Sequence, residues 1–322
     1  MDNKLIISLS PHVHSGSSIE KCMWQVVIAM VPALAIAIYT FGLPALSVIL
    51  ISVAACVLTE WCIEKFCFHR PCTIGNGSAI ITGLLLAMNL PSILPWWMVI
   101  IGAVVAIGIG KMSFGGLGQN IWNPALVGRV FLLLSFPAAM TTWPTTVGSG
   151  VDAVSGATVD ATSGATLLSY LNADEAGQTT FNMMDMLIGH MNGSLGEVGS
   201  IAILIGLAYL LIARVITWHI PVSILASAAL FSWLFGGNPC LDLLAGGLLL
   251  GAVFMATDYT TSPMTPLGQI IYGFCIGAIT MVIRRFGSYP EGASFAILLM
   301  NSFTPLINRY CHPRVLGERR KK

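Results

Sequence analysis

The sequence predicts an all-α polytopic membrane protein with about ten transmembrane helices in two inverted five-helix repeats. Of its 322 residues, 56% are hydrophobic and only 9% are charged, whereas soluble domains carry about 25% charged residues. So few charged side chains cannot cover a soluble fold this apolar, and the same composition excludes disordered and disulfide-framework proteins. The apolar residues are gathered in separate runs, and some of these runs recur along the chain.

Six apolar runs approach the roughly 20 residues that a helix needs to cross a hydrocarbon core about 30 Å thick. They are 24–42, 44–64, 93–110, 199–217, 219–235 and 268–284. Four shorter runs, 78–90, 122–137, 241–257 and 291–308, are flanked or broken by Gly, Pro or Asn. We expect the short runs to be buried, tilted or interrupted helices whose free backbone groups face protein or a cofactor rather than lipid.

Two of the short runs recur in the second half of the chain. The sequence Gly-Leu-Leu-Leu at 83–86 returns at 247–250, and Asn120, Trp122 and Pro124 match Asn301, Phe303 and Pro305. These matches predict a first repeat over 24–137 and a second over 199–308. Because each repeat has an odd number of spans, the two would have opposite orientations in the membrane. Chance similarity between Leu- and Gly-rich helices is the alternative.

The distribution of basic residues predicts the orientation. With the N-terminal segment 1–23 and the basic tail 309–322 in the cytoplasm, most Lys and Arg fall inside, as the positive-inside rule requires. Arg284 and Arg285 fall outside against the rule, and Arg129 lies within a run. The loop 138–198 holds no Lys or Arg and is predicted to be extracytoplasmic. The other 12 of the 15 basic residues are Lys4, Lys21, Lys65, Arg70, Lys111, Arg214, Arg309, Arg314, Arg319, Arg320, Lys321 and Lys322.

Several other kinds of site are not indicated. A net charge of +1 provides no basic surface for nucleic acid. The eight cysteines include no C-x-x-C pair of the kind that holds zinc or iron–sulfur clusters, so we predict buried or loop thiols and no metal site. Glu60 and Glu64, at one end of the second run, are predicted to reach water or to pair with Lys65.

The loop 138–198 carries a tandem motif. Residues 152–158 and 160–166 both follow the pattern D-x-x-S-G-A-T, which is the acceptor pattern for FMN joined through its phosphate to a threonine hydroxyl. The small residues before the threonine leave the backbone open to a phosphate. The composition alone would also suit a polar linker. The predicted cofactor-binding residues are Asp160, Ser163, Gly164, Ala165 and Thr166, with Thr158 as the alternative acceptor.

Thr166 is favoured over Thr158 by the residues that follow each. Asp160 lies two residues after Thr158 and would repel the phosphate, while an apolar run beginning with Leu167 follows Thr166. That run can begin a helix, and free N–H groups at a helix N-terminus favour a phosphate.

A resemblance to a known family is carried by the tandem motif, by the opening segment Ser-Pro-His-Val-His-Ser-Gly at 10–16, and by the segments 115–126 and 255–263. The chain resembles the D subunit of the Rnf ion-translocating electron transport complex. It is also similar to the paralogous B subunit of the sodium-pumping NADH:quinone reductase. The resemblance covers nearly the whole chain. Because that reductase component typically has a longer N-terminal extension, we favour the Rnf family. The family normally has one acceptor followed by a small or proline residue and Leu, which Thr166 fits better than Thr158.

The resemblance implies an electron-relay subunit in the bacterial inner membrane, inactive alone, that carries covalent FMN. The complex would couple ferredoxin:NAD electron transfer to sodium or proton movement. Its partners would be iron–sulfur subunits, a second covalent-flavin subunit and a flavin transferase for maturation. Relatives are thought to hold noncovalent riboflavin too, for which Asn76, Asn120, Asn123 and Asn301 are candidate linings. Asp258 could bind a flavin or an ion. All five could equally serve as caps or interhelix hydrogen bonds.

Two other classes of protein remain open at this point. Inverted five-helix repeats also build urea and ammonium channels, although a channel has no need of an FMN acceptor motif. A scaffold subunit that has lost its cofactor is the other alternative.

Overall fold

The structure, a computed structural model, describes residues 18–69, 72–143, 187, 193–287 and 292–311. All regular secondary structure in these ranges is helical. Each of the predicted apolar runs contains at least one helix, which confirms the all-helical prediction. The count of ten crossings and the two repeats stay predictions.

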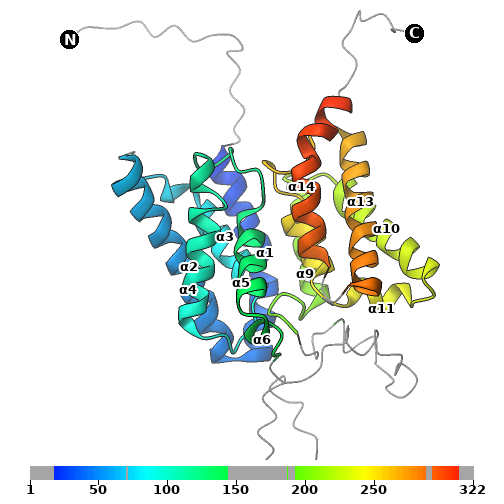
Figure 1. The fold of residues 1–322 in the computed structure, drawn as a ribbon, viewed down its shortest axis with the longest axis horizontal. Helices are drawn as coiled ribbons and strands as arrows, with labels where there is room; N and C mark the ends of the chain where they lie inside the picture. The colour runs from blue at the N-terminus through cyan, green and yellow to red at the C-terminus, as the bar shows by residue number, and fades with distance from the viewer. Residues whose placement is uncertain (1–17, 70–71, 144–186, 188–192, 288–291, 312–322) are drawn as a thin grey trace, which may run out of the picture.

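The first half of the chain forms one group of helices, drawn from blue to green in Figure 1. Helix α2 packs against both α3 and α4, and α4 packs against α5. Short helical turns complete this half at η1 (Ile63–Phe68), η2 (Ile74–Asn76) and η3 (Met112–Phe114). The helices are α1 (Ile19–Phe41), α2 (Leu43–Cys62), α3 (Ser78–Met88), α4 (Trp96–Gly108), α5 (Pro124–Ser135) and α6 (Pro137–Met140).

The second half packs around the pair α10 and α13, with α14 against α13. Helix α9 packs against α1 and α14 against α5, so the two halves of the chain are in contact. The elements are α9 (Ser200–Ile212), α10 (His219–Leu234), α11 (Pro239–Leu244), α12 (Leu248–Leu250), η4 (Gly251–Met255), α13 (Pro266–Phe286) and α14 (Ala293–Tyr310).

Three helices begin with the same local signal, a side-chain cap followed by proline. The side chains of Asn123, Asn238 and Thr265 accept hydrogen bonds from backbone N–H groups of the first turns of α5, α11 and α13. Proline follows each of these caps, where its fixed φ suits a helix and its missing N–H costs nothing. These starts therefore follow directly from the sequence.

Four helices are long and apolar enough to cross a membrane by length and composition: 19–41, 43–68, 96–114 and 266–286. The runs 199–217 and 219–235, which we expected to be full length, instead form helices of 13 and 16 residues. Helix α9 ends early because Arg214 adopts the left-handed conformation, with φ of 55°. The run 291–308, predicted to be short, is an 18-residue helix that continues through Pro305.

The run 241–257 is interrupted, as predicted. It divides into α11, α12 and the π-helical turn η4, and Gly246, with φ of 67°, separates the first two. The matching run in the first half forms the continuous helix α3. The two runs that share Gly-Leu-Leu-Leu therefore differ in local structure.

The start of α1 and the end of α14 lie at one end of the molecule, and α6 and α11 lie at the other (Figure 1). The predicted loop 138–198 is largely outside the described residues, as are all the predicted FMN residues from Thr158 to Thr166. After the loop, Gly196 donates its backbone N–H to the Met88 carbonyl at 2.6 Å, and Leu195 donates to the Leu90 carbonyl at 3.3 Å. The returning chain is thereby attached to the end of α3.

Candidate functional site: a cavity between the two halves

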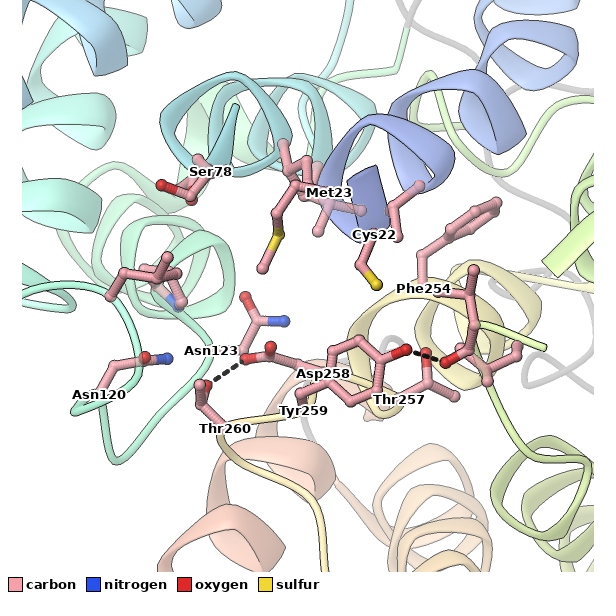
Figure 2. Close-up of a pocket in the computed structure, with 18 of the residues that line it drawn as sticks. Cys22, Met23, Ser78, Asn120, Asn123, Phe254, Thr257, Asp258, Tyr259 and Thr260 are labelled. Atoms are coloured by element: carbon pink, nitrogen blue, oxygen red, sulfur yellow. Dashed lines mark hydrogen bonds between the residues drawn. The ribbon is translucent and has the colours of Figure 1, made fainter. Parts of the chain in front are cut away.

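A cavity lies where the two halves of the chain meet (Figure 2). It contains about 760 Å³ of space free of protein atoms, a volume that includes the open solvent at its mouth. Its walls come from α1, α3, α5 and α9 and from residues 254–260. The side chains of Cys22 and Met23 project into it from α1.

Three residues that the sequence analysis singled out, Asn120, Asn123 and Asp258, all line this cavity. Asp258 is distant in sequence from Asn120 and Asn123, and the contact between the two halves brings it to the same cavity. The other two asparagines considered there, Asn76 and Asn301, are not among the lining residues. Asn301 instead contacts the buried hydroxyl of Tyr272 at 2.5 Å.

Asn123 joins the two halves. Its Oδ1 accepts from the Ala125 N–H at 3.1 Å and caps α5, while its Nδ2 donates to the Met255 carbonyl at 3.1 Å. The side chain thus fixes the start of α5 against the end of η4. Asn123 is therefore a helix cap, one of the two roles considered from the sequence, and it also lines the cavity.

Asp258 lies in the turn that follows η4. Its Oδ2 accepts from the hydroxyls of Thr260 at 3.0 Å and Thr261 at 3.3 Å. Next to it, the Tyr259 hydroxyl donates to the Val215 carbonyl (Figure 2). Asp258 therefore organises its own turn and also places a carboxylate at the cavity.

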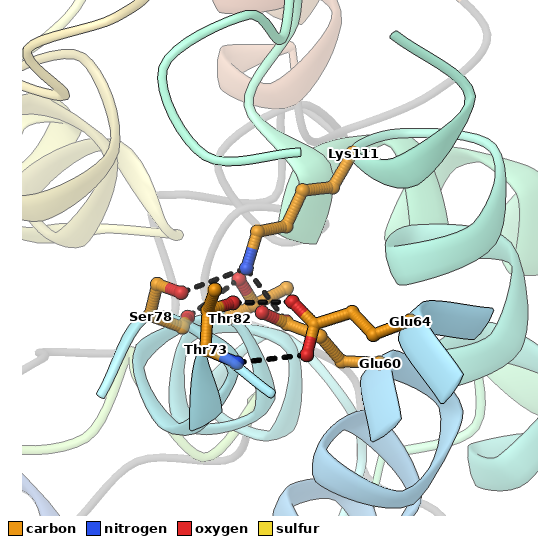
Figure 3. A network of polar contacts seen from close by, with 6 residues as sticks. All are labelled: Glu60, Glu64, Thr73, Ser78, Thr82 and Lys111. Atoms are coloured by element: carbon orange, nitrogen blue, oxygen red, sulfur yellow. Dashed lines mark hydrogen bonds and ion pairs between the residues drawn. The ribbon is translucent and has the colours of Figure 1, made fainter. Parts of the chain in front are cut away.

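A buried ion pair lies at another wall (Figure 3). Lys111 Nζ is 2.6 Å from Glu60 Oε2 and donates to Ser78 Oγ at 2.7 Å. The two charged side chains are only 3% and 1% exposed. Lys111 and Ser78 line the cavity, whereas Glu60 does not.

The prediction for Glu60 and Glu64 was wrong. Both side chains are buried, and Glu64 accepts hydrogen bonds from the backbone N–H of Thr73, at 2.9 Å, and from its hydroxyl. Lys65 lies over the Trp61 ring instead, with Nζ 4.7 Å from the centroid. Glu60 and Glu64 have these partners because residues 73–78 and 111 fold against them. The local sequence around the two glutamates does not indicate this contact.

Arg129, which lies within an apolar run, and Arg284, one of the two arginines predicted to fall outside against the charge rule, are both buried. Arg129 donates to Asn89 Oδ1 at 2.9 Å and to Ser294 Oγ at 2.5 Å, which connects α5 to α14. Arg284 donates to the carbonyls of Asp242 at 2.6 Å and Ala245 at 2.9 Å. Arg284 thus satisfies carbonyl groups at the end of α11.

The ion pair between Lys111 and Glu60 was not predicted from the sequence. A signal was present, because both are ionisable and lie at the ends of apolar runs, and such residues are expected to find partners within a membrane bundle. The positive-inside rule instead assigned Lys111 to the cytoplasmic cations. Among the described residues, no group of three or more His, Cys, Asp or Glu could hold a metal ion.

The lining of the cavity is mainly apolar, with a few polar groups. Apolar side chains such as Val26, Ile81 and Leu85 form much of its lining. Polar groups occur at separate points, with Lys111 and Ser78 at one wall and Asp258 at another. A mainly apolar pocket with a few fixed polar groups is the usual form of a small-molecule or cofactor site.

The fold and the cavity define a helical membrane protein with an internal cavity. Residues 6–317 match the family described as NQR2, RnfD, RnfE, so the chain belongs to this family. The D subunit of a proton-translocating ferredoxin:NAD(+) oxidoreductase complex from Clostridium ljungdahlii is 45% identical over 99% of this chain and 98% of its own.

Two further relatives carry related names. The D subunit of an Na(+)-translocating ferredoxin:NAD(+) oxidoreductase complex from Acetobacterium woodii is 45% identical over 97% of this chain and 95% of its own. The D subunit of an ion-translocating oxidoreductase complex from Halorhodospira halophila is 38% identical over 96% of this chain and 95% of its own. These similarities confirm the resemblance stated from the sequence.

Proposed function

We propose that this protein is the membrane electron-relay subunit of a complex that couples ferredoxin:NAD electron transfer to the translocation of sodium ions or protons. The observation that carries the proposal is 45% identity over nearly the full length to the D subunits of two such complexes. One of these complexes is named for protons and the other for sodium, so the proposal covers both ions. The chain would act only with its partner subunits.

The first proposed cofactor is FMN, attached to Thr166 by a phosphoester. The repeated D-x-x-S-G-A-T motif supports it, with Asp160, Ser163, Gly164 and Ala165 forming the approach to the acceptor. Attachment through the phosphate leaves the isoalloxazine ring free for one- and two-electron chemistry. A flavin transferase would be needed for this modification.

The second proposed cofactor is a noncovalent flavin, riboflavin, in the cavity between the halves. The apolar lining would exclude water from the ring. Asn120 and Asp258 would offer hydrogen bonds to its polar edges, and Asn123 would hold the wall of the cavity in place. The flavin would take electrons from one flavin or iron–sulfur group of the complex and pass them to another, including a second covalent-flavin subunit.

We further propose that both termini are cytoplasmic and that residues 138–198 are outside the bacterial inner membrane. The absence of Lys and Arg from this loop supports that orientation. So does the placement of the start of α1 and the end of α14 opposite α6 in Figure 1.

Filling the cavity tests the second cofactor. In Cys22→Trp, an indole replaces a thiol that projects into the cavity. We expect the purified complex to release at least tenfold less noncovalent flavin on denaturation. The covalent flavin, seen as a fluorescent band on a denaturing gel, should be unchanged. The matched control is Cys62→Trp, at an exposed position outside the cavity.

Equal flavin release from Cys22→Trp and from the unmodified complex would overturn the cavity assignment. A colourless complex with no fluorescent band would overturn the flavoprotein proposal as a whole.

A further inference from the structure

The wall of the cavity at Lys111 is electropositive. The lysine side chain lines the cavity, while its partner Glu60 lies outside the lining. The ion pair is therefore oriented, with its cation toward the cavity and its carboxylate behind. Because Coulomb energy falls with distance, the ammonium outweighs its partner carboxylate at this wall, while the carboxylate of Asp258 lies at another wall.

Two helices add to this potential. Ser78 is the first residue of α3 and Pro124 the first of α5, and both line the cavity. The helices have 11 and 12 residues, and their N-terminal ends carry a positive partial charge. The Ser78 hydroxyl also accepts from Lys111 Nζ, which ties the lysine to the start of α3.

Glu60 and Ser78 hold the end of the lysine side chain in place. Lys111 Nζ is 2.6 Å from a carboxylate oxygen of Glu60 and 2.7 Å from the hydroxyl of Ser78. The nitrogen is therefore fixed at one position beside the mainly apolar lining of the cavity.

We propose that Lys111, held by Glu60 and Ser78, is a positioning residue that stabilises the negative charge gained by the cavity flavin on reduction. This inference rests on the proposed noncovalent flavin. Two electrons from a reduced flavin or iron–sulfur group of the complex and one proton from water convert the neutral oxidised ring to an anion. Lys111 favours that anion and raises the reduction potential of this flavin above that of free riboflavin.

The experiment measures the midpoint potential of the noncovalent flavin in the intact complex by spectroelectrochemical titration. The main variant is Lys111→Met combined with Glu60→Gln, which removes both charges and leaves no buried ion unpaired. We expect the equilibrium constant for two-electron reduction to fall at least tenfold, a decrease of about 30 mV in midpoint potential. Lys65→Met, which removes an exposed cation from outside the cavity lining, is the matched control and should leave the potential unchanged.

Flavin content is measured in the same samples, so that the two possible failures are distinct. If the double variant retains its flavin with an unchanged potential, the role of Lys111 is overturned and the cofactor proposal stands. If the unmodified complex contains no noncovalent flavin, the cofactor proposal fails and this inference fails with it. A fall of similar size in Lys65→Met would show that distant surface charge sets the potential, which also overturns the inference.

Discussion

Lys111 and Glu60 are 51 residues apart in the sequence and in direct contact in the fold. The hydropathy pattern shows that both charged residues lie near apolar runs. Their pairing depends on how α2 packs against the turn after α4, and no local sequence pattern predicts that packing. The polar residues at the cavity, Asn120, Asn123 and Asp258, were better indicated by the sequence. Each lies beside a helix break, and polar groups at such breaks are expected to face a site rather than lipid.

The first residue-scale prediction concerns the two candidate FMN acceptors. Thr166→Ala should abolish the fluorescent flavin band on a denaturing gel, because it removes the hydroxyl that would form the phosphoester. Thr158→Ala should leave the band at normal intensity, because Asp160 makes that copy unfavourable for a phosphate. The two variants are matched, since each removes the same hydroxyl from the same motif.

Loss of the band in Thr158→Ala alone would move the attachment to the first copy of the motif. A band that persists in both single variants and in the double variant would contradict attachment at either threonine.

Among the elements, the starts of helices were easier to predict than their ends. Asn123-Pro124 marked a break in the sequence and begins α5 in the structure. The end of α9 gave no such signal, because it depends on Arg214 adopting a positive φ within an apolar run. Pro305 suggested a break, yet α14 continues through it. There the Thr304 hydroxyl donates to the Thr261 carbonyl at 2.8 Å and holds the helix against a neighbouring segment.

Helices α10 and α13 meet through small residues. A Cβ added at Gly277 would lie 2.6 Å from the Ile224 carbonyl oxygen, and one at Gly273 would lie 3.0 Å from that of Ile220. These two glycines form a G-x-x-x-G pattern, which allows helix backbones to approach closely within a membrane. The close approach of α10 and α13 therefore depends on the absence of two side chains.

Gly277→Ala should destabilise the protein by about 1–3 kcal/mol, the usual cost of overpacking a tight core contact. The measurement is the midpoint of thermal unfolding of the purified complex in detergent. Gly108→Ala is the control, since the nearest atom to a Cβ there is 3.9 Å away in the Ile63 side chain. Equal midpoints for the two variants would contradict a tight α10–α13 contact.

For the whole molecule, the contacts between the halves were not predicted. The sequence aligned the segment around Asn120 with that around Asn301 as equivalent parts of two repeats, without placing them in contact. In the structure the two segments meet, and Trp122 Nε1 donates to Ser302 Oγ at 2.7 Å. The sequence also did not indicate that α9 packs against α1. That contact requires close approach at Gly206, where an added Cβ would lie 2.5 Å from the Ala29 carbonyl oxygen.

The proposed orientation can be tested on intact cells. A cysteine in place of Thr179, within the loop that lacks Lys and Arg, should react with a membrane-impermeant thiol reagent. A cysteine in place of Glu318, in the basic tail, should react only after lysis. The unmodified chain, with its eight native cysteines, provides the background. The reverse pattern of labelling would invert the topology.

The Lys111–Glu60 contact also bears on biosynthesis. A charged side chain that enters the centre of a bilayer alone costs about 2.5–3.5 kcal/mol on the insertion scale, and less near the ends of a span. When α2 first leaves the ribosome, Glu60 has no partner, because Lys111 is synthesised 51 residues later. We expect α2 to remain shallow or in contact with the insertion machinery until α4 arrives, so that these helices enter the lipid together rather than one at a time.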